Sequence, residues 1–312
     1  IAMAGRARRG DFNLMSSFDY YSPKLKGLLG FVLMFLLGVL IANMLGVGFV
    51  FASMKGVLPQ NFLMEYGQLI IYPLMFIPAM MFAASRSRRN QLFDLPRKPL
   101  DGNGFGRMGG ILCALCVSML TLSMAFLLDP LSLVLPPMDE KTRAAMEMML
   151  HGPLLVNLLC VSIMAPIFEE WLCRGIIMRS LLGVGRPWVA IVLSSAFFAL
   201  IHFNLWQAIP AFIIGLLLGW VYYRTGSLKL TMLMHCVNNT FSLAISRIPS
   251  LKDYETFNEM MGGWSVSYIA SLLGCLLVAA FCIYIFSRDT RASASGREPS
   301  LPTSSSSSEE GM

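Results

Sequence analysis

The sequence has 312 residues, of which 56% are hydrophobic and 13% are charged, and its mean hydropathy is +0.64. About a quarter of the residues in a soluble domain are charged, so this chain lacks roughly half of the charge expected in water. The composition excludes an ordinary soluble domain and predicts a protein embedded in a lipid bilayer. The formal net charge of +6 would suit nucleic acid, but its distribution along the chain indicates another cause.

Apolar runs of membrane-spanning length recur along the whole chain. A helix rises 1.5 Å per residue, so about 20 apolar residues cross the hydrocarbon core. This rule predicts an all-α, polytopic transmembrane helical bundle of about eight spans. The predicted spans are 27–52, 62–84, 108–128, 153–174, 188–203, 208–223, 228–245 and 264–286. The first run exceeds the length of a signal-peptide core, so we expect it to be retained.

The loops between these spans differ in charge. Arginine and lysine gather in the loops after the second, fourth and sixth spans, whereas the opposite loops are poorer in positive charge. Short basic loops stay in the cytoplasm, so both termini are expected to face it. The absence of organelle signals and the compact length suggest a bacterial cytoplasmic membrane. The basic excess is then topological, and we expect no nucleic-acid partner.

The composition also divides the chain into five segments. We expect a cytoplasmic N-terminal segment at 1–26, transmembrane helices with a surface loop at 27–151, and a core carrying the chemistry at 152–247. A loop and the last transmembrane helix follow at 248–286, and a serine-rich tail at 287–312 has few apolar residues to bury, which predicts disorder. Within the surface loop, the stretch from Asp139 to Leu150 predicts either an amphipathic helix on the membrane surface or an ordinary capped helix.

The seven cysteines lie in apolar stretches without the paired spacing of a disulfide framework. Cys113 and Cys116 form a C-x-x-C pattern, but small thiols inside an apolar helix pack like alanine. We expect packing rather than a redox or metal role for this pair.

Ionisable side chains inside membrane spans are expensive and mark functional sites. In the fourth span, Glu170 and Arg174 stand at i and i+4, where the guanidinium can pair with the carboxylate. Glu169 points about 100° away on a helix and has no adjacent cation, so it is free to act as a base on water. Pro166 lacks an N–H and should loosen the helix just before the two glutamates.

Two of the three histidines also lie in apolar runs. Phe198 and His202 stand at i and i+4, and so do His235 and Asn239. Glu169 and His202 are each about 16 or 17 residues from the turn between them, so an antiparallel hairpin would bring them to similar depth. A lone histidine on a helix face is more often a hydrogen-bonded packing residue, but two of them with a glutamate pair favour a functional site.

The ordered set Glu169-Glu170-x-x-x-Arg174, Phe198-x-x-x-His202 and His235-x-x-x-Asn239 resembles the CPBP intramembrane proteases. This family includes the CAAX prenyl endopeptidases and bacterial Abi-type, bacteriocin-processing relatives, and the resemblance covers about 153–245. It implies a cytoplasm-facing cavity and peptide-bond hydrolysis without an acyl-enzyme. By this resemblance, Glu169 activates water with the help of His202, His235 and Asn239 donate to the oxyanion, Glu170 and Arg174 form a structural pair, and Phe198 shapes the site.

Other functions have to be weighed against this one. Two histidines and a glutamate could ligate Zn²⁺, but no H-E-x-x-H motif is present, and we expect no cofactor. A non-catalytic scaffold or immunity protein would use the polar cluster only to hold helices together. A transporter fits poorly, because the intramembrane charges lie in one half and no inverted repeat is visible. The expected partners are the bilayer and a peptide or membrane-protein substrate, such as a leader peptide, a bacteriocin precursor or a membrane-protein terminus.

Overall fold

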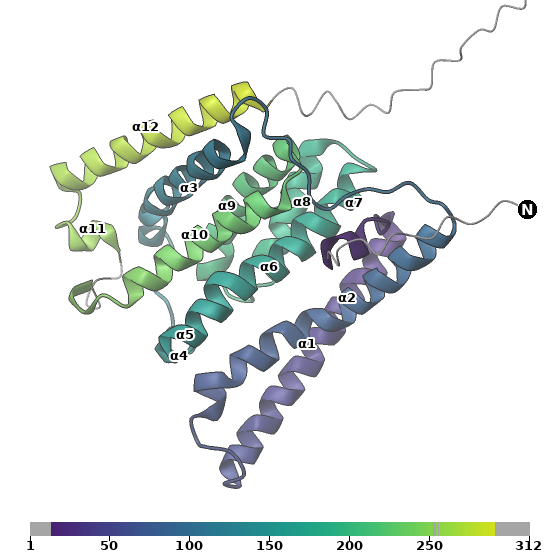
Figure 1. Cartoon of the computed structure of the whole chain (residues 1–312). Coiled ribbons are helices and arrows are strands. Elements are labelled where there is room, and N and C mark those ends of the chain that lie inside the picture. The colour runs from purple at the N-terminus through teal and green to yellow at the C-terminus, as the bar shows by residue number, and fades with distance from the viewer. Residues whose placement is uncertain (1–13, 252–253, 255, 291–312) are drawn as a thin grey trace, which may run out of the picture.

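A computed structural model describes residues 14–251, 254 and 256–290, and these residues form helices and turns without strands (Figure 1). The predicted all-α fold is confirmed, and each of the eight predicted spans coincides with a helix. Most of the tail predicted to be disordered lies outside the described residues. The last helix ends at Asp289, so the first residues assigned to that tail are helical instead.

The long helices are α1 (Leu25–Met54), α2 (Gln68–Leu92), α3 (Gly109–Leu127), α8 (Pro187–Leu200), α9 (Leu205–Thr225), α10 (Leu228–Ser246) and α12 (Val266–Asp289). A further continuous helical stretch changes its winding four times: α5 (Leu154–Asn157), the π-helical η4 (Leu158–Met164), α6 (Ala165–Glu170), the π-helical η5 (Trp171–Met178) and α7 (Arg179–Leu182). The short elements are η1 (Leu14–Phe18), η2 (Leu63–Gly67), η3 (Asp129–Leu133), α4 (Glu140–His151), η6 (Pro249–Leu251) and α11 (Phe257–Met260).

Six helical stretches of the described chain are long and apolar enough to cross a membrane: 25–54, 65–92, 109–133, 154–182, 205–225 and 266–289. Helix α8 is apolar but shorter, and α10 interrupts its apolar run with His235, Asn238 and Asn239. The chain is therefore an integral membrane protein with a polytopic helical bundle, while the number of eight spans stays a prediction.

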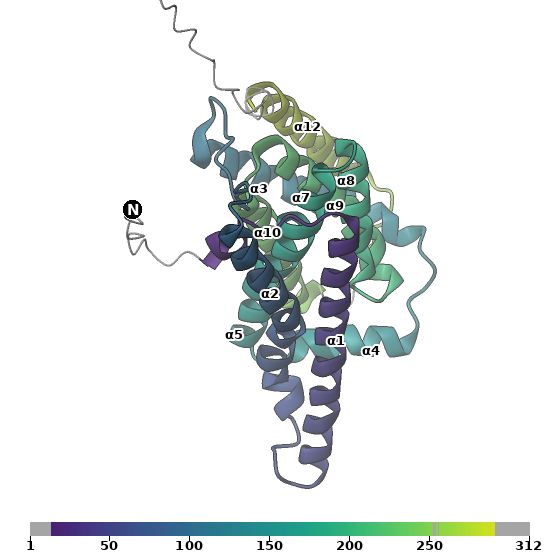
Figure 2. The ribbon, with the colours of Figure 1, turned by 90° about the vertical axis from the view of Figure 1, so that its right-hand side faces the viewer.

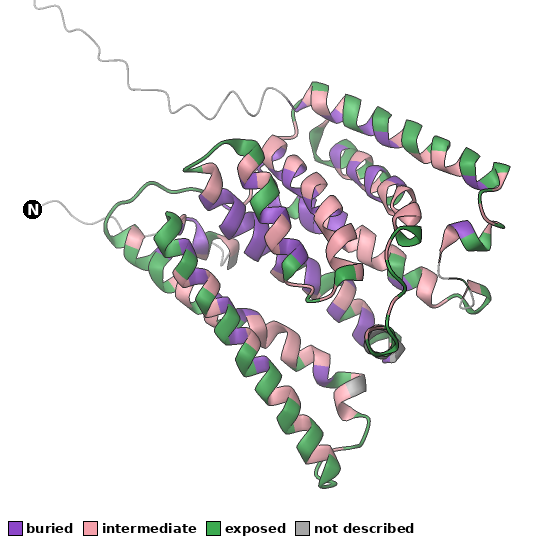
Figure 3. Cartoon of the chain, turned by 180° about the vertical axis from the view of Figure 1, so that it is seen from behind, coloured by how far each residue is buried: buried purple, intermediate pink, exposed green. Residues whose placement is uncertain are grey.

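The bundle surrounds the helical stretch 154–182. Helices α1 and α2 form a hairpin that projects from one side, and α3 and α12 pair on the other (Figures 1 and 2). Between them, α10 packs on η4 and α6, and α8 packs on η5. Every residue from 169 to 180 is buried, and Figure 3 shows buried positions concentrated here, whereas the outer helices are largely exposed. Apolar side chains on these outer faces meet lipid, and the central helix can carry polar groups away from it.

Segments predicted to share one side of the membrane meet at one end of the bundle. Four contacts join them: Arg97 Nη2 with Asp19 Oδ2 (2.7 Å), Arg179 Nη2 with the Phe18 carbonyl (3.2 Å), the Gly102 N–H with the Gly226 carbonyl (2.8 Å) and Arg224 Nε with Thr290 Oγ1 (3.0 Å). Four segments therefore lie together: the one that precedes α1, the basic loop after α2, the turn after α9 and the end of α12. This arrangement agrees with the alternation of basic loops, and the assignment of this end to the cytoplasm stays a prediction.

The helix predicted within the surface loop is present as α4. Asp139 caps it by accepting a hydrogen bond from the Thr142 N–H at 2.9 Å, an arrangement that satisfies one of the free donors of the first turn. The backbone N–H and the hydroxyl of Thr142 together lower the pKa of Asp139. The cap explains why the helix begins here, and a membrane-surface location stays a prediction.

Proline and glycine shape the helices around the centre of the bundle. Pro166 lacks the N–H that would donate to the carbonyl four residues earlier in an α-helix. The π-helical turn η4 ends just before this proline, at Met164. The predicted loosening of the helix before the glutamates is thus confirmed. In the projecting hairpin, a Cβ on Gly38 would lie 2.0 Å from the Met75 carbonyl oxygen, so only glycine allows α1 and α2 to approach this closely.

Candidate active site

The predicted pair of Glu170 and Arg174 lies at the centre of the bundle. Arg174 Nη1 is 2.6 Å from Glu170 Oε1, and both side chains are completely buried. Arg174 Nη2 also donates to the Gly215 carbonyl at 2.8 Å. A Cβ on Gly215 would lie 3.3 Å from Arg174 Nη2 and 3.1 Å from the Ser195 side chain, so the missing side chain lets α9 come close to the guanidinium. The pair joins α6 and η5 to α9.

His235 lies between the two glutamates. Its Nδ1 is 3.2 Å from Glu170 Oε1, and its Nε2 is 3.9 Å from Glu169 Oε2. The first distance is a hydrogen bond, and the second is too long for one. Glu169 Oε2 is buried and has no hydrogen-bond partner among the described residues. One imidazole of α10 is thus anchored to the structural carboxylate and faces the free oxygen of the other.

Phe198 connects the remaining motif residues. The Ser194 hydroxyl, one turn earlier on α8, donates to the Cys173 carbonyl at 3.0 Å and fastens α8 to η5. The buried Phe198 ring lies under the Arg174 guanidinium, 4.6 Å from ring centre to Cζ. The rings of His202 and His235 both approach it edge to face, at 5.1 and 5.3 Å between centroids. Both histidines therefore contact the same phenyl ring, and helices four, five and seven of the predicted order meet.

His202 lies outside the helix to which it was assigned. Helix α8 ends at Leu200, and His202 occupies the following turn, next to Phe203 with a positive φ of 56°. Its Nδ1 is 2.8 Å from the Phe198 carbonyl. Since a carbonyl only accepts, Nδ1 carries the proton, and in the neutral ring Nε2 presents a lone pair. The histidine that approaches Glu169 within 4 Å is His235, whereas the sequence paired Glu169 with His202.

Asn239 is held by two hydrogen bonds. Its Nδ2 donates to the Val161 carbonyl at 2.9 Å, where the π-helical η4 precedes Glu169. Its Oδ1 accepts from Asn238 Nδ2 at 3.3 Å. A side-chain amide has two N–H donors, so one remains for a further acceptor. The orientation of the amide is fixed by these neighbours.

Comparison with known proteins decides what kind of domain this is. Residues 151–241 match the family model described as type II CAAX prenyl endopeptidase Rce1-like, and the match includes all seven motif residues described above. This segment of the chain is similar to a CAAX protease domain. Searches of curated proteins and of solved structures found no match. The resemblance to the CPBP intramembrane proteases is thereby confirmed, and the domain belongs to a family of proteases that act on peptides in a membrane.

The protease domain receives one polar contact that the sequence did not predict. The Tyr72 hydroxyl, from α2, donates a hydrogen bond to Glu169 Oε1. Tyr72 lies outside the matched segment and outside every motif that we identified. Its one sequence signal is a hydroxyl in an apolar span just before Pro73, which is too common to point to a site.

The described residues contain no group of three His, Cys, Asp or Glu side chains placed to hold a metal ion. Both glutamates of the protease domain are near His235, but these three side chains are not placed to hold a metal ion together. The zinc alternative therefore finds no ligand set in the part of the chain that the structure describes, and metal dependence has to be tested by experiment.

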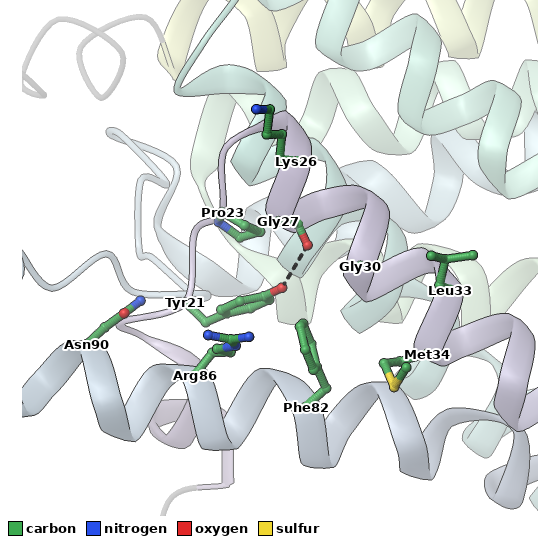
Figure 4. A pocket seen from close by; sticks show the side chains of 10 residues that line it. All are labelled: Tyr21, Pro23, Lys26, Gly27, Gly30, Leu33, Met34, Phe82, Arg86 and Asn90. Carbon is green, nitrogen blue, oxygen red and sulfur yellow. Dashed lines mark hydrogen bonds between the residues drawn. The ribbon is translucent and has the colours of Figure 1, made fainter.

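A pocket of about 540 Å³ lies beyond the protease domain, between the start of α1 and the second half of α2. Tyr21, Phe82 and Arg86 line it (Figure 4). The Tyr21 hydroxyl donates to the Gly27 carbonyl at 3.3 Å, and burial raises the pKa of Tyr21 to about 12, partly offset by Arg86. No motif residue lines this pocket, so it is separate from the candidate active site.

Proposed function

We propose that this protein is an intramembrane endopeptidase in which Glu169 activates the water that cleaves the peptide bond. The observation that carries the proposal is the free, buried Oε2 of Glu169, 3.9 Å from His235 Nε2. A water molecule about 2.8 Å from each of these two atoms would bridge them. The family match over 151–241 supports proteolysis as the reaction.

In the proposed reaction, Glu169 accepts a proton from water, and the hydroxide oxygen forms a bond to the substrate carbonyl carbon. The carbonyl electron pair moves to oxygen and gives a tetrahedral oxyanion. When the oxyanion collapses, the C–N bond breaks, and the proton passes from Glu169 to the departing amine. His202, whose Nε2 has a lone pair in the neutral ring, assists the proton transfer. Such acid–base catalysis contributes about 10²–10⁴-fold.

Two donors are proposed to stabilise the oxyanion. Asn239 has one N–H left after its hydrogen bond to Val161. His235 uses Nδ1 toward Glu170, so it donates from Nε2 as well only when the ring carries both protons. Removal of one oxyanion donor costs about 10²–10³-fold in kcat in other proteases. Glu170, Arg174 and Phe198 hold this arrangement without contacting substrate.

We also propose that the substrate is a peptide or a membrane-protein terminus, that the protein resides in a bacterial cytoplasmic membrane, and that both termini face the cytoplasm. The gathering of basic loops at one bundle end supports this orientation. Arg179 belongs to that end, and Glu169 precedes it by ten residues, which is at most about 15 Å along a helix. The site is thus within reach of a chain entering from the basic end.

The test compares membrane peptides from cells that carry the wild type with those from cells that carry Glu169→Gln or His202→Ala. Glu140→Gln, an exposed change on α4, is the matched control. We expect one or more cleavage products to fall by at least about 100-fold with Glu169→Gln and to persist with Glu140→Gln. If Glu169→Gln protein accumulates normally and every product persists, the protease proposal is wrong. A scaffold role would survive both substitutions in the site.

A further inference from the structure

We propose that Tyr72 is a positioning residue of the active site, which holds Glu169 so that Oε2 is turned toward His235. The proposal rests on the proposed function, because it assigns a role relative to the carboxylate that activates water. By this proposal, the projecting hairpin of α1 and α2 supplies one residue to an active site whose motifs all lie in 151–241.

The contact between Tyr72 and Glu169 divides the roles of the two carboxylate oxygens. Oε1 accepts the hydrogen bond from the Tyr72 hydroxyl, and Oε2 has no hydrogen-bond partner in the described part of the chain. Tyr72 is also the one hydrogen-bond donor to the Glu169 side chain among the described residues. Without it, the carboxylate would turn freely, because the last torsion of a glutamate side chain has a broad, roughly two-fold profile.

The surrounding packing holds Tyr72 in place. Phe76, one turn further along α2, lies 5.5 Å from the Tyr72 ring and stacks on Phe168 at 5.0 Å with an interplanar angle of 17°. Phe168 directly precedes Glu169, so α2 contacts α6 through two successive pairs. Helix α1 also approaches α2 closely in this region, where Gly38 packs against the backbone of Met75. The tyrosine hydroxyl is therefore aimed by rigid contacts rather than by its hydrogen bond alone.

This geometry has a chemical consequence for the first step. Ionised Glu169 is the form that can accept a proton from water. The proton then goes to Oε2, on the side of His235, while Oε1 stays bound to Tyr72. Loss of the Tyr72 hydroxyl would release Oε1 and let the carboxylate turn away from His235, without removing the base itself.

The experiment replaces Tyr72 by phenylalanine in the full-length protein in lipid, which keeps the ring packing and removes only the donor. Tyr66→Phe is the matched control, because Tyr66 lies in the adjoining η2, is 44% exposed and makes no described polar side-chain contact. We expect kcat to fall about 10- to 100-fold, as for loss of a hydrogen bond to a charged group, with KM within about twofold. Tyr66→Phe should leave both constants unchanged.

A second measurement does not require turnover. Dicyclohexylcarbodiimide is an apolar reagent that modifies carboxyl groups within membranes, and mass spectrometry locates the product. We expect Tyr72→Phe to increase labelling at Glu169 several-fold over the wild type and over Tyr66→Phe, because Oε1 is no longer held by the tyrosine hydroxyl. No labelling is expected at that position in Glu169→Gln.

The outcomes separate this proposal from the proposed function. If Glu169→Gln is inactive but Tyr72→Phe matches the wild type in kcat and labelling, the role of Tyr72 is refuted and the protease function stands. If Glu169→Gln retains full activity, the protease mechanism fails, and the labelling still decides whether Tyr72 controls the carboxylate. Equal changes in kcat and labelling for Tyr72→Phe and Tyr66→Phe would show that the Tyr72 hydroxyl has no specific role at Glu169, and would also refute the proposal.

Discussion

Replacement of Arg174 by methionine is expected to destabilise the bundle more than any exposed charge substitution. The guanidinium and the Glu170 carboxylate are both fully buried and 2.6 Å apart. Methionine fills much of the same volume but leaves Glu170 without its cation, with only hydrogen bonds from His235 and Thr231. Removal of one member of a buried ion pair costs about 3–5 kcal/mol, because the other charge stays buried without compensation.

This magnitude translates into a measurable shift of the unfolding temperature. One kcal/mol corresponds to about 2–4 °C for domains of 150–250 residues, so Arg174→Met should lower Tm by about 6–20 °C. A maleimide dye that fluoresces on reaction with thiols can follow unfolding in detergent, since Cys113, Cys160, Cys173 and Cys282 are buried in the folded protein. The control is Arg88→Met, which removes an exposed cation from α2 and should shift Tm by no more than about 2 °C.

A double variant distinguishes the charge from the packing. Glu170→Gln combined with Arg174→Met leaves no buried charge at this position, so it should be more stable than Arg174→Met alone. The reasoning would be refuted if Arg174→Met and Arg88→Met unfolded at the same temperature. It would also be refuted if the double variant were less stable than Arg174→Met, because the cost would then come from lost packing against Phe198 and Gly215.

Two further predictions concern the hairpin and the metal. Gly38→Ala places a Cβ against the Met75 carbonyl and should cost about 1–3 kcal/mol of folding stability by overpacking. Gly48→Ala is the control and should leave Tm nearly unchanged, because no heavy atom lies within 4 Å of the new Cβ. Equal Tm values for the two variants would show that α1 and α2 separate without cost. Peptidase activity should stay within about twofold after EDTA and phenanthroline treatment, because the proposed mechanism uses no metal, and a loss that Zn²⁺ restores would establish the zinc alternative instead.

Local physics made much of this protein predictable. A low charge content and runs of about 20 apolar residues predicted the helices, since a bilayer leaves few other ways to satisfy the backbone. The Glu170–Arg174 pair followed from the i, i+4 spacing on one helix, and the loosening before Glu169 followed from Pro166. These predictions hold because each depends on residues that are a few positions apart.

The sequence by itself determined the class of protein, the helices and the residue types that can do chemistry. Only the tertiary structure decided which of them meet: His235 with both glutamates, Asn239 with the Val161 carbonyl, and Tyr72 with Glu169 across 97 positions of sequence. Contacts within one helix follow from its period. Contacts between helices depend on the depth and rotation at which whole helices pack, and those are set by close approaches such as Gly38 on Met75, which no motif announces.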